Sequence, residues 1–332
     1  MTPVLKTEGL VKRFGRRKAL DGLTLSIPGG TITGLVGSNG AGKTTLFSVV
    51  TGILSQDSGT IDLFGEGPFD PELHSGRVAL LPQDASLPRE ASVKGLLEYY
   101  AELQGLSREE AGRQIPEIIA DVHLTERAND RIRSLSHGMR KRVMIAQALI
   151  GEPELILLDE PLNGLDPREV AHMRNILRNR KPGQSMIISS HNLDEIERLC
   201  NRVIFMEHGR LVLMSGIREL TGQGHLLRYE LKGTPPLDLL RRRMPEAEFE
   251  YEEREGLLSC RYSEDMYNEA EVNRVALRAL LDEGVDILSV RRGSELESEY
   301  LRRSPQRAET GKTDKASSGA STDILPQAGR NR

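Results

Sequence analysis

The sequence predicts an α/β protein built around a mainly parallel sheet, and three features carry this prediction. Two apolar runs, "LILLDE" at 155–160 and "SMIISSH" at 185–191, have the composition of strands buried on both faces. Segments with helical periodicity alternate with such runs along the chain. A glycine-rich stretch, "GLVGSNGAGKTTL" at 34–46, joins a predicted strand to a predicted helix. In folds of this class the ligand lies at the carboxyl ends of the strands.

The composition points to a reducing compartment and away from general nucleic-acid binding. The 332 residues include 45 Lys and Arg against 49 Asp and Glu, so charge alone predicts no general affinity for phosphate backbones. Cys200 and Cys260 are far apart and match neither a disulfide framework nor a zinc site. The first 20 residues lack a signal-peptide pattern, and no window is apolar enough to span a membrane. We therefore expect a cytoplasmic protein.

The main domain is predicted over residues 1–220. Short strands and turns surround the glycine-rich stretch up to residue 83, and a helical insertion follows at about 84–150. In this insertion Ser107 and Glu110 predict a capping box, and Pro116 is expected to kink or break the helix that they begin. Strands alternate with helices again after the insertion.

Two further regions are predicted after residue 220. Residues 222–303 follow the order β, α, β, β, α, β of a ferredoxin-like unit, which predicts a small α+β accessory domain. Residues 304–332 are polar and nearly free of aromatic side chains, so we expect a disordered tail.

The glycine-rich stretch has the pattern of a phosphate-binding loop. The residues that match GxxxxGK[S/T] are Gly37, Ser38, Asn39, Gly40, Ala41, Gly42, Lys43 and Thr44. Glycines allow successive N–H groups to turn toward phosphate oxygens, and the following helix adds its free amides. We expect Lys43 to reach the β- and γ-phosphates and the Thr44 hydroxyl to bind Mg²⁺. The alternative is a turn without a ligand, and the motif alone does not separate kinase, GTPase and ATPase.

Acidic and histidine side chains follow the two apolar runs. Asp159 ends one predicted strand, where it is placed to hold the Mg²⁺ shell, and Glu160 is a candidate general base for an attacking water. His191 ends the other strand and is a candidate partner of a γ-phosphate oxygen or of the water. The structural alternatives are helix capping or ion pairing for the carboxylates and a purely structural role for the histidine.

Six ordered motifs together resemble the ATP-binding subunit of an ABC transporter over residues 1–215. They are "GSNGAGKT", "LLPQD", "LSHGM", "LILLDEP", "NGLD" and "SSH". The resemblance implies a P-loop NTPase core of RecA type with an antiparallel β-subdomain and the helical insertion. It implies ATP and Mg²⁺ as ligands, and hydrolysis of ATP to ADP and phosphate as the activity.

The resemblance also implies roles for individual residues. Residues 37–45, ending at Thr45, correspond to the Walker A loop and 155–159 to the Walker B strand, with Glu160 as the catalytic glutamate. Gln83 corresponds to the Q-loop glutamine, which contacts Mg²⁺ or the attacking water and reports the nucleotide state to the membrane part.

Further roles concern the switch histidine and the contact with a second subunit. Asp166 corresponds to the D-loop aspartate at the dimer seam and His191 to the switch histidine. Ser136 and Gly138 belong to the signature loop, which caps the γ-phosphate held by the opposite subunit.

The sequence departs from the family pattern at the signature loop and at the adenine position. His137 and Met139 replace a glycine and the glutamine of LSGGQ, which bears on the rate of turnover more than on the role of the loop. Phe14 takes the place where the family stacks an aromatic ring on adenine, and stacking needs only the ring face. The alternative for Phe14 is a strand aromatic that faces the core.

By this resemblance, two subunits enclose two ATP molecules head to tail and power a separate integral membrane permease. The second subunit is another copy or a paralogue, and the permease docks near residues 83–97. A single cassette with a small C-terminal domain favours export, and the chain is expected on the cytoplasmic face of the membrane.

Two alternatives stay open: a soluble ABC ATPase that acts on nucleic acid or the ribosome, and a nucleotide-gated regulatory module that hydrolyses ATP weakly. The single P-loop and the short helical block disfavour the first, so no nucleic-acid partner is expected. A GTPase or small-molecule kinase is least favoured, because no N-K-x-D motif is present.

Overall fold

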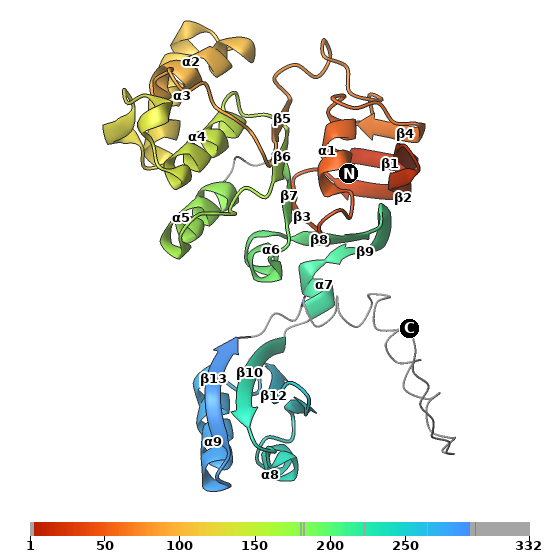
Figure 1. Cartoon of the computed structure of the whole chain (residues 1–332), viewed down its shortest axis with the longest axis vertical. Helices are drawn as coiled ribbons and strands as arrows, with labels where there is room; N and C mark the ends of the chain where they lie inside the picture. The colour runs from red at the N-terminus through yellow and green to blue at the C-terminus, as the bar shows by residue number, and fades with distance from the viewer. Residues whose placement is uncertain are drawn as a thin grey trace, which may run out of the picture.

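The computed structural model describes residues 3–179, 181, 183–221, 224–263, 265–292 and 296. The tail predicted at 304–332 lies outside the described residues. Within them, two sheets and a set of helices form the larger part of the molecule, and a third sheet with two helices forms a smaller unit beside it (Figure 1).

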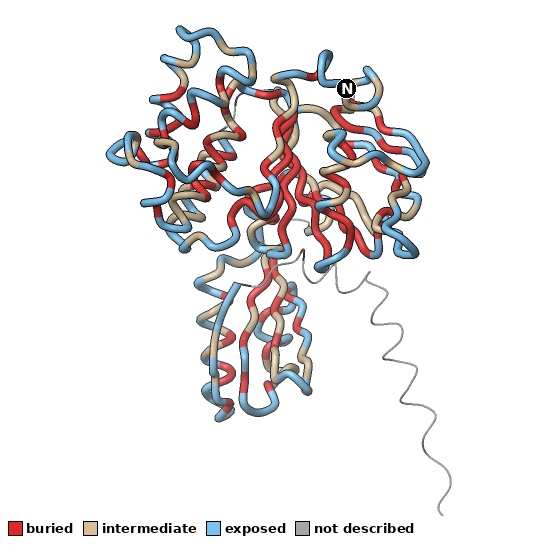
Figure 2. Tube along the Cα trace, turned by 45° about the horizontal axis from the view of Figure 1, so that its top comes forward, coloured by how far each residue is buried: buried red, intermediate tan, exposed pale blue. Residues whose placement is uncertain are grey.

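A six-stranded sheet forms the centre of the larger part. Its strands, in spatial order, are β5 (Val78–Leu81), β6 (Leu155–Asp159), β7 (Ser185–Ser190), β3 (Ile32–Val36), β8 (Arg202–Glu207) and β9 (Arg210–Gly216). All neighbours run parallel except β8 and β9. Every residue of β3, β6 and β7 is buried, as Figure 2 shows, because helices or the second sheet cover both faces. The predicted parallel α/β core is therefore confirmed.

A three-stranded antiparallel sheet covers one side of this centre. Its strands are β2 (Arg17–Pro28), β1 (Pro3–Phe14) and β4 (Ser58–Leu63). Helix α1 (Lys43–Val50) lies between the two sheets, and its buried Leu46 and Phe47 join a core with side chains of both. This packing fixes the start of α1 at the carboxyl end of β3, because the short glycine-rich loop connects them.

The remaining helices of the larger part lie on the other side of the six-stranded sheet. They are α2 (Val93–Leu103), α3 (Arg108–Asp121), α4 (His137–Leu149), α5 (Pro167–Arg178), α6 (Leu193–Leu199) and α7 (Ile217–Thr221), with short 3₁₀ turns at Thr125–Arg127 and Ile132–Ser134. Helices α2 and α3 are packed on α4 and not directly on the strands. Aliphatic side chains of α2 to α6 share one core with this face of the sheet. None of the described helices is long and apolar enough to cross a membrane.

Helix α3 confirms one local prediction and corrects part of another, the break considered at Pro116. The capping box of Ser107 and Glu110 is present at its start. Pro116 does not break the helix, which continues to Asp121. Ile115 and Ile119, on either side of the proline, are buried in the shared core, and their packing offsets the cost of the missing backbone hydrogen bond.

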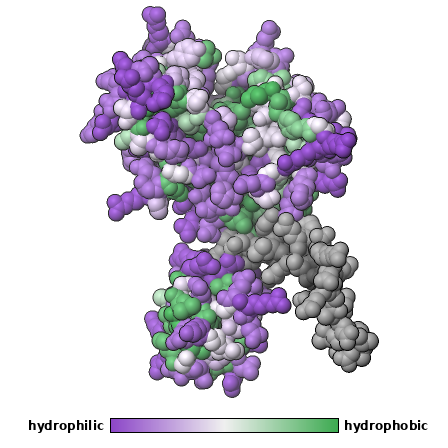
Figure 3. Space-filling view, in the orientation of Figure 1, coloured by the Kyte–Doolittle hydropathy of each residue, from purple (hydrophilic) through white to green (hydrophobic). Residues whose placement is uncertain are grey.

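The smaller unit has the predicted order β, α, β, β, α, β. Its elements are β10 (Gly224–Lys232), α8 (Leu237–Arg243), β11 (Glu248–Glu252), β12 (Leu257–Ser263), α9 (Glu269–Asp282) and β13 (Asp286–Arg292). The antiparallel sheet has the order β11-β12-β10-β13 and a core of its own around the buried Tyr229. Apolar side chains also gather on its surface, where Leu281 and Leu288 are exposed (Figure 3). Leu296 returns to the larger part and is buried in its core. The domain limits given above stay a prediction.

Candidate functional site

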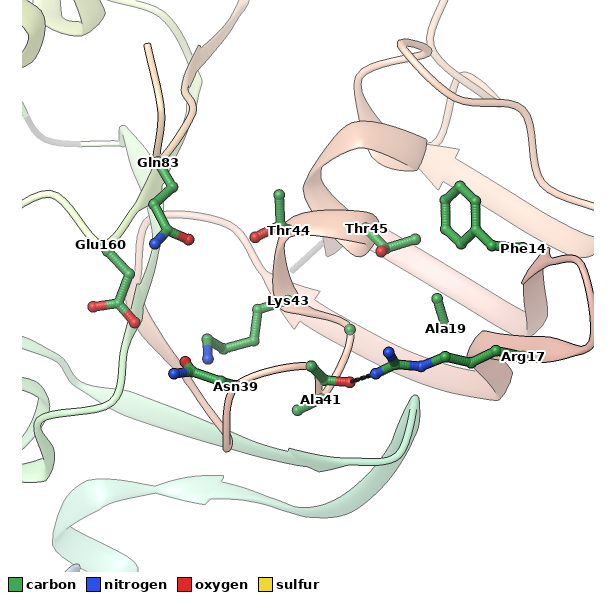
Figure 4. Close-up of a pocket in the computed structure, with 12 residues that line it drawn as sticks. Phe14, Arg17, Ala19, Asn39, Ala41, Lys43, Thr44, Thr45, Gln83 and Glu160 are labelled. Carbon is green, nitrogen blue, oxygen red and sulfur yellow. Dashed lines mark hydrogen bonds between the residues drawn. The ribbon is translucent and has the colours of Figure 1, made fainter.

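A pocket of about 380 Å³ lies between the glycine-rich loop, the β1–β2 hairpin and the carboxyl ends of the parallel strands (Figure 4). The lining residues are Phe14, Arg17, Ala19, Asn39, Gly40, Ala41, Gly42, Lys43, Thr44, Thr45, Gln83 and Glu160. The fold thus brings together residues from four separate segments of the chain, and the sequence analysis had singled out most of these residues.

The loop before α1 is shaped for an anion. Gly40 and Gly42 have φ angles of 83° and 107°, in the region that favours glycine. A Cβ atom on Gly42 would lie only 2.4 Å from the carbonyl oxygen of Ala19. No side chain caps the N-terminus of α1, so its first amides are free for a ligand. Lys43 is buried, and its Nζ donates to the carbonyl oxygen of Gly37 at 2.7 Å.

A chain of hydrogen bonds ties this loop to the ends of β6 and β7. Thr44 Oγ1 donates to Asp159 Oδ2 at 2.6 Å, and Ser189 Oγ donates to Asp159 Oδ1. The backbone N–H of Glu160 donates to Ser189 Oγ at 2.9 Å. Sequence reasoning missed Ser189; the available signal was a small polar residue within the apolar run that ends at His191. Its strand position pairs directly with Asp159.

Glu160 and His191 form a contact at the same edge of the sheet. Glu160 is 6% exposed and has a positive φ angle of 49°, a strained backbone conformation that turns the chain away from the strand axis. Nδ1 of His191 lies 3.1 Å from each carboxylate oxygen of Glu160. Gln83 approaches the pocket from the segment after β5 (Figure 4). Glu160 and His191 can accept a proton from a water molecule, and the Gln83 amide can hydrogen-bond to that water.

Lys141 is a second residue that sequence reasoning missed. It lies on α4 and is 6% exposed, although the charged stretch "RKR" around it predicts a solvent-facing position. Burial lowers its pKa, and the negative charges of Glu160, Asp159 and Asp84 oppose this shift. The helical insertion therefore presents a positive charge to the acidic end of β6.

The predicted signature and D-loop residues lie together, outside the pocket. Ser136 caps α4 by accepting a hydrogen bond from the Met139 N–H, and Asp166 caps α5 in the same way. A Cβ atom on Gly164 would lie 3.0 Å from Nε2 of His137, and one on Gly138 would lie 3.6 Å from a methyl of Leu165. These two loops are in contact within one chain. The remaining predicted residues, Gly37 and Ser38, form the start of the phosphate loop.

Phe14 is 51% exposed and lines the pocket, so the core-facing alternative is wrong. One face of its ring is approached by Lys12, whose Nζ lies 5.7 Å from the ring centroid. The ring is available for stacking on a planar ligand.

A glycine loop that opens a helix, a Thr–Asp pair at the strand ends and a buried glutamate beside them define a P-loop nucleoside-triphosphatase. Comparisons with known proteins specify the class further. The family model described as "ABC transporter" matches residues 20–163. An uncharacterized ABC transporter ATP-binding protein of Methanocaldococcus jannaschii is 33% identical over 221 residues, which are 66% of this chain and 80% of the relative.

Other relatives agree with this match. The Nod factor export ATP-binding protein I of Ralstonia nicotianae is 34% identical, with 66% of this chain and 69% of that protein covered. The linearmycin resistance ATP-binding protein LnrL of Bacillus subtilis is 32% identical, covering 63% and 68%. A solved structure titled as the ATP-binding subunit of an ABC transporter superposes with a TM-score of 0.61 and 27% identity, covering 66% of this chain and 92% of that one. The chain belongs to the ABC transporter ATP-binding family, whose members bind ATP and hydrolyse it to power transport.

Proposed function

We propose that this chain hydrolyses ATP at the pocket described above, as one half of a head-to-tail dimer that drives export through a separate membrane permease. The observation that carries the proposal is the chain of contacts from Thr44 through Asp159 and Ser189 to Glu160. It joins the phosphate loop to the candidate base at one strand edge. Export is supported by the Nod factor export and linearmycin resistance relatives.

The donor set fits Mg²⁺. Thr44 Oγ1 and Asp159 supply oxygen ligands that already lie in hydrogen-bond contact, and Gln83 adds an amide oxygen at the pocket wall. Bound Mg²⁺ would neutralise negative charge on the β- and γ-phosphates. Lys43 and the free amides of α1 would bind the phosphates, and Phe14 would stack on adenine.

The chemistry assigned to this chain is the activation of water. Glu160 accepts a proton from the water that attacks the γ-phosphorus, and His191 holds the Glu160 carboxylate in place. In-line attack releases ADP as the leaving group and leaves inorganic phosphate. Buried surroundings strengthen these electrostatic contacts.

The site is completed by a second copy or a paralogue. Ser136 and Gly138 lie outside the pocket of their own chain, at the start of α4, where N–H groups favour an anion. In the proposed dimer they contact the γ-phosphate held by the other subunit, with Asp166 at the seam. The permease is proposed to contact residues 83–97 and to hold the chain on the cytoplasmic face of the membrane.

Glu160→Gln tests the proposal. The variant should bind ATP with unchanged affinity, lose steady-state phosphate release and accumulate as an ATP-bound dimer in gel filtration. Glu154→Gln is the matched control, because Glu154 lies just before β6, pairs with Arg77 and is remote from the pocket. Phosphate release from Glu160→Gln at the wild-type rate would remove Glu160 from the role of base.

A further inference from the structure

Arg17 is a charged pocket residue to which the proposed reaction gives no role. It is the first residue of β2, three positions after Phe14, and its side chain extends toward the phosphate loop (Figure 4). Its Nη2 donates to the carbonyl oxygen of Gly40 at 3.1 Å. A Cβ atom on Gly40 would lie 2.7 Å from this nitrogen, so the guanidinium approaches closely only because residue 40 is glycine.

Two neighbouring cations of the hairpin, Lys12 and Lys18, are paired with acids, whereas Arg17 is not. Lys12 donates to the carbonyl oxygen of Ser55 at 2.6 Å and lies 3.9 Å from Asp57. Lys18 donates to Asp21 at 2.5 Å. Within the described part of the chain, Arg17 has no carboxylate at ion-pair distance, and the bond to Gly40 uses one of its five N–H donors. Its charge and most of its donors are therefore available to a ligand in the pocket.

The position of Arg17 along the pocket selects which part of a nucleotide it meets. If adenine stacks on Phe14 and the β- and γ-phosphates lie at Lys43, then the ribose and α-phosphate span the wall between them. The Arg17 guanidinium stands at that wall, held by Gly40 of the phosphate loop. A planar guanidinium matches two phosphate oxygens in a way that an ammonium group does not.

We propose that Arg17 binds the α-phosphate of the nucleotide. Its contribution to affinity is therefore the same for AMP, ADP and ATP, because all three carry this phosphate, and does not depend on the β- and γ-phosphates. This inference rests on the proposed function, because it takes Phe14 and Lys43 as the two ends of the same ligand. Arg17 also joins the antiparallel sheet to the phosphate loop through its bond to Gly40.

The test measures binding of adenosine, AMP, ADP and ATP to the full chain by displacement of a fluorescent ATP analogue. In the wild type, the gain in affinity from adenosine to AMP reports the α-phosphate contact. Arg17→Ala should weaken AMP, ADP and ATP by about tenfold each and leave adenosine unchanged. Arg16→Ala is the matched control: it removes the same charge from an exposed neighbour that does not line the pocket, and affinities should stay within about twofold.

Two results would overturn the assignment. One is an unchanged ratio of AMP to adenosine affinity in Arg17→Ala. The other is an equal loss for all four ligands, which would make Arg17 a support of the hairpin and not a phosphate ligand. Failure of the proposed function looks different: wild-type chain that does not retain ATP, or Lys43→Ala that binds ATP normally.

Discussion

Nδ1 of His191 lies 3.1 Å from both carboxylate oxygens of Glu160, although 31 residues separate them in the chain. The contact joins the residues that follow β6 and β7, two neighbouring parallel strands. Glu160 is buried, whereas the side chain of His191 is 60% exposed. The exposed imidazole of His191 therefore contacts a carboxylate that the core shields from solvent.

His191→Ala should lower kcat by about 100-fold or more, in the range of lost acid–base assistance, with little change in the KM for ATP. The reason is that the imidazole orients the base and does not carry the binding of the nucleotide. Steady-state phosphate release over a range of ATP concentrations measures both constants. A rise in the KM for ATP as large as the predicted fall in kcat, with kcat itself unchanged, would instead assign His191 to ground-state binding.

Asp159→Asn should remove most of the effect of Mg²⁺ on nucleotide affinity, because the amide leaves the Thr44 hydroxyl without an anionic partner and offers the cation a weaker ligand. Nucleotide titrations with Mg²⁺ and with a chelator, on wild type and variant, measure this difference. Thr44→Val should show the same loss. A variant whose affinity still rises with Mg²⁺ as in the wild type would place the metal elsewhere.

Gly42→Ala should destabilise the phosphate loop and abolish nucleotide binding. The new methyl would meet the Ala19 carbonyl oxygen at 2.4 Å, and the φ angle of 107° strains any side chain. Gly112→Ala is the control with the opposite sign. Gly112 lies inside α3 with open space around its Cβ position, so alanine should stabilise the chain by about 0.5–1 kcal/mol.

Thermal and denaturant unfolding of the two glycine variants measures the stability difference, and fluorescent nucleotide binding measures the function. Retained binding in Gly42→Ala would show that the loop relaxes around the methyl group. A loss of stability in Gly112→Ala would contradict the open space observed on α3.

Glu195→Gln should stabilise the chain near neutral pH and have no effect in acid. Burial is the main cause that raises the pKa of Glu195 above the ordinary value of 4.5, against a weaker opposing bond from Ser190. As pH rises above 4.5, the unfolded chain loses this proton first, so stability falls until the folded group has also ionised, and the loss remains at higher pH. Glutamine keeps the shape without the charge.

Urea unfolding of wild type and Glu195→Gln at about pH 7 and about pH 4 measures the effect. The variant should have the higher midpoint at neutral pH, and the two midpoints should converge in acid. If the two midpoints differ by the same amount at both pH values, the change in stability comes from packing and not from ionisation.

Much of the fold followed from local sequence pattern. The uninterrupted apolar runs of β6 and β7 are dictated by burial on both faces, and the glycines of the phosphate loop by backbone geometry. The order of elements after residue 222 was also visible, because period-2 and period-3.6 patterns alternate there. The break considered at Pro116 was wrong, because local propensity was weighed without the isoleucine packing that supports α3, whereas a kink there stays a prediction.

The sequence predicted some residues of the functional site and missed others, again because local patterns do not show how distant segments pack. Lys43, Asp159 and Glu160 stand in motifs whose spacing carries their chemistry, so it was foreseen that they lie near one another at the carboxyl ends of the strands. Ser189 and Lys141 gave no comparable signal, since a serine at the end of a strand and a lysine on a helix are ordinary at the level of sequence. Their importance arises from partners far along the chain.

By itself, the sequence determined the parallel core, the phosphate loop and the acidic strand end, because short-range backbone sterics and hydrophobic periodicity act within a few residues. Only the tertiary structure decided that Arg17 reaches Gly40, that His191 meets Glu160 and that Lys141 is buried near that carboxylate. Those contacts depend on how sheets and helices pack, and packing sums many weak interactions between distant segments that no single stretch of residues encodes.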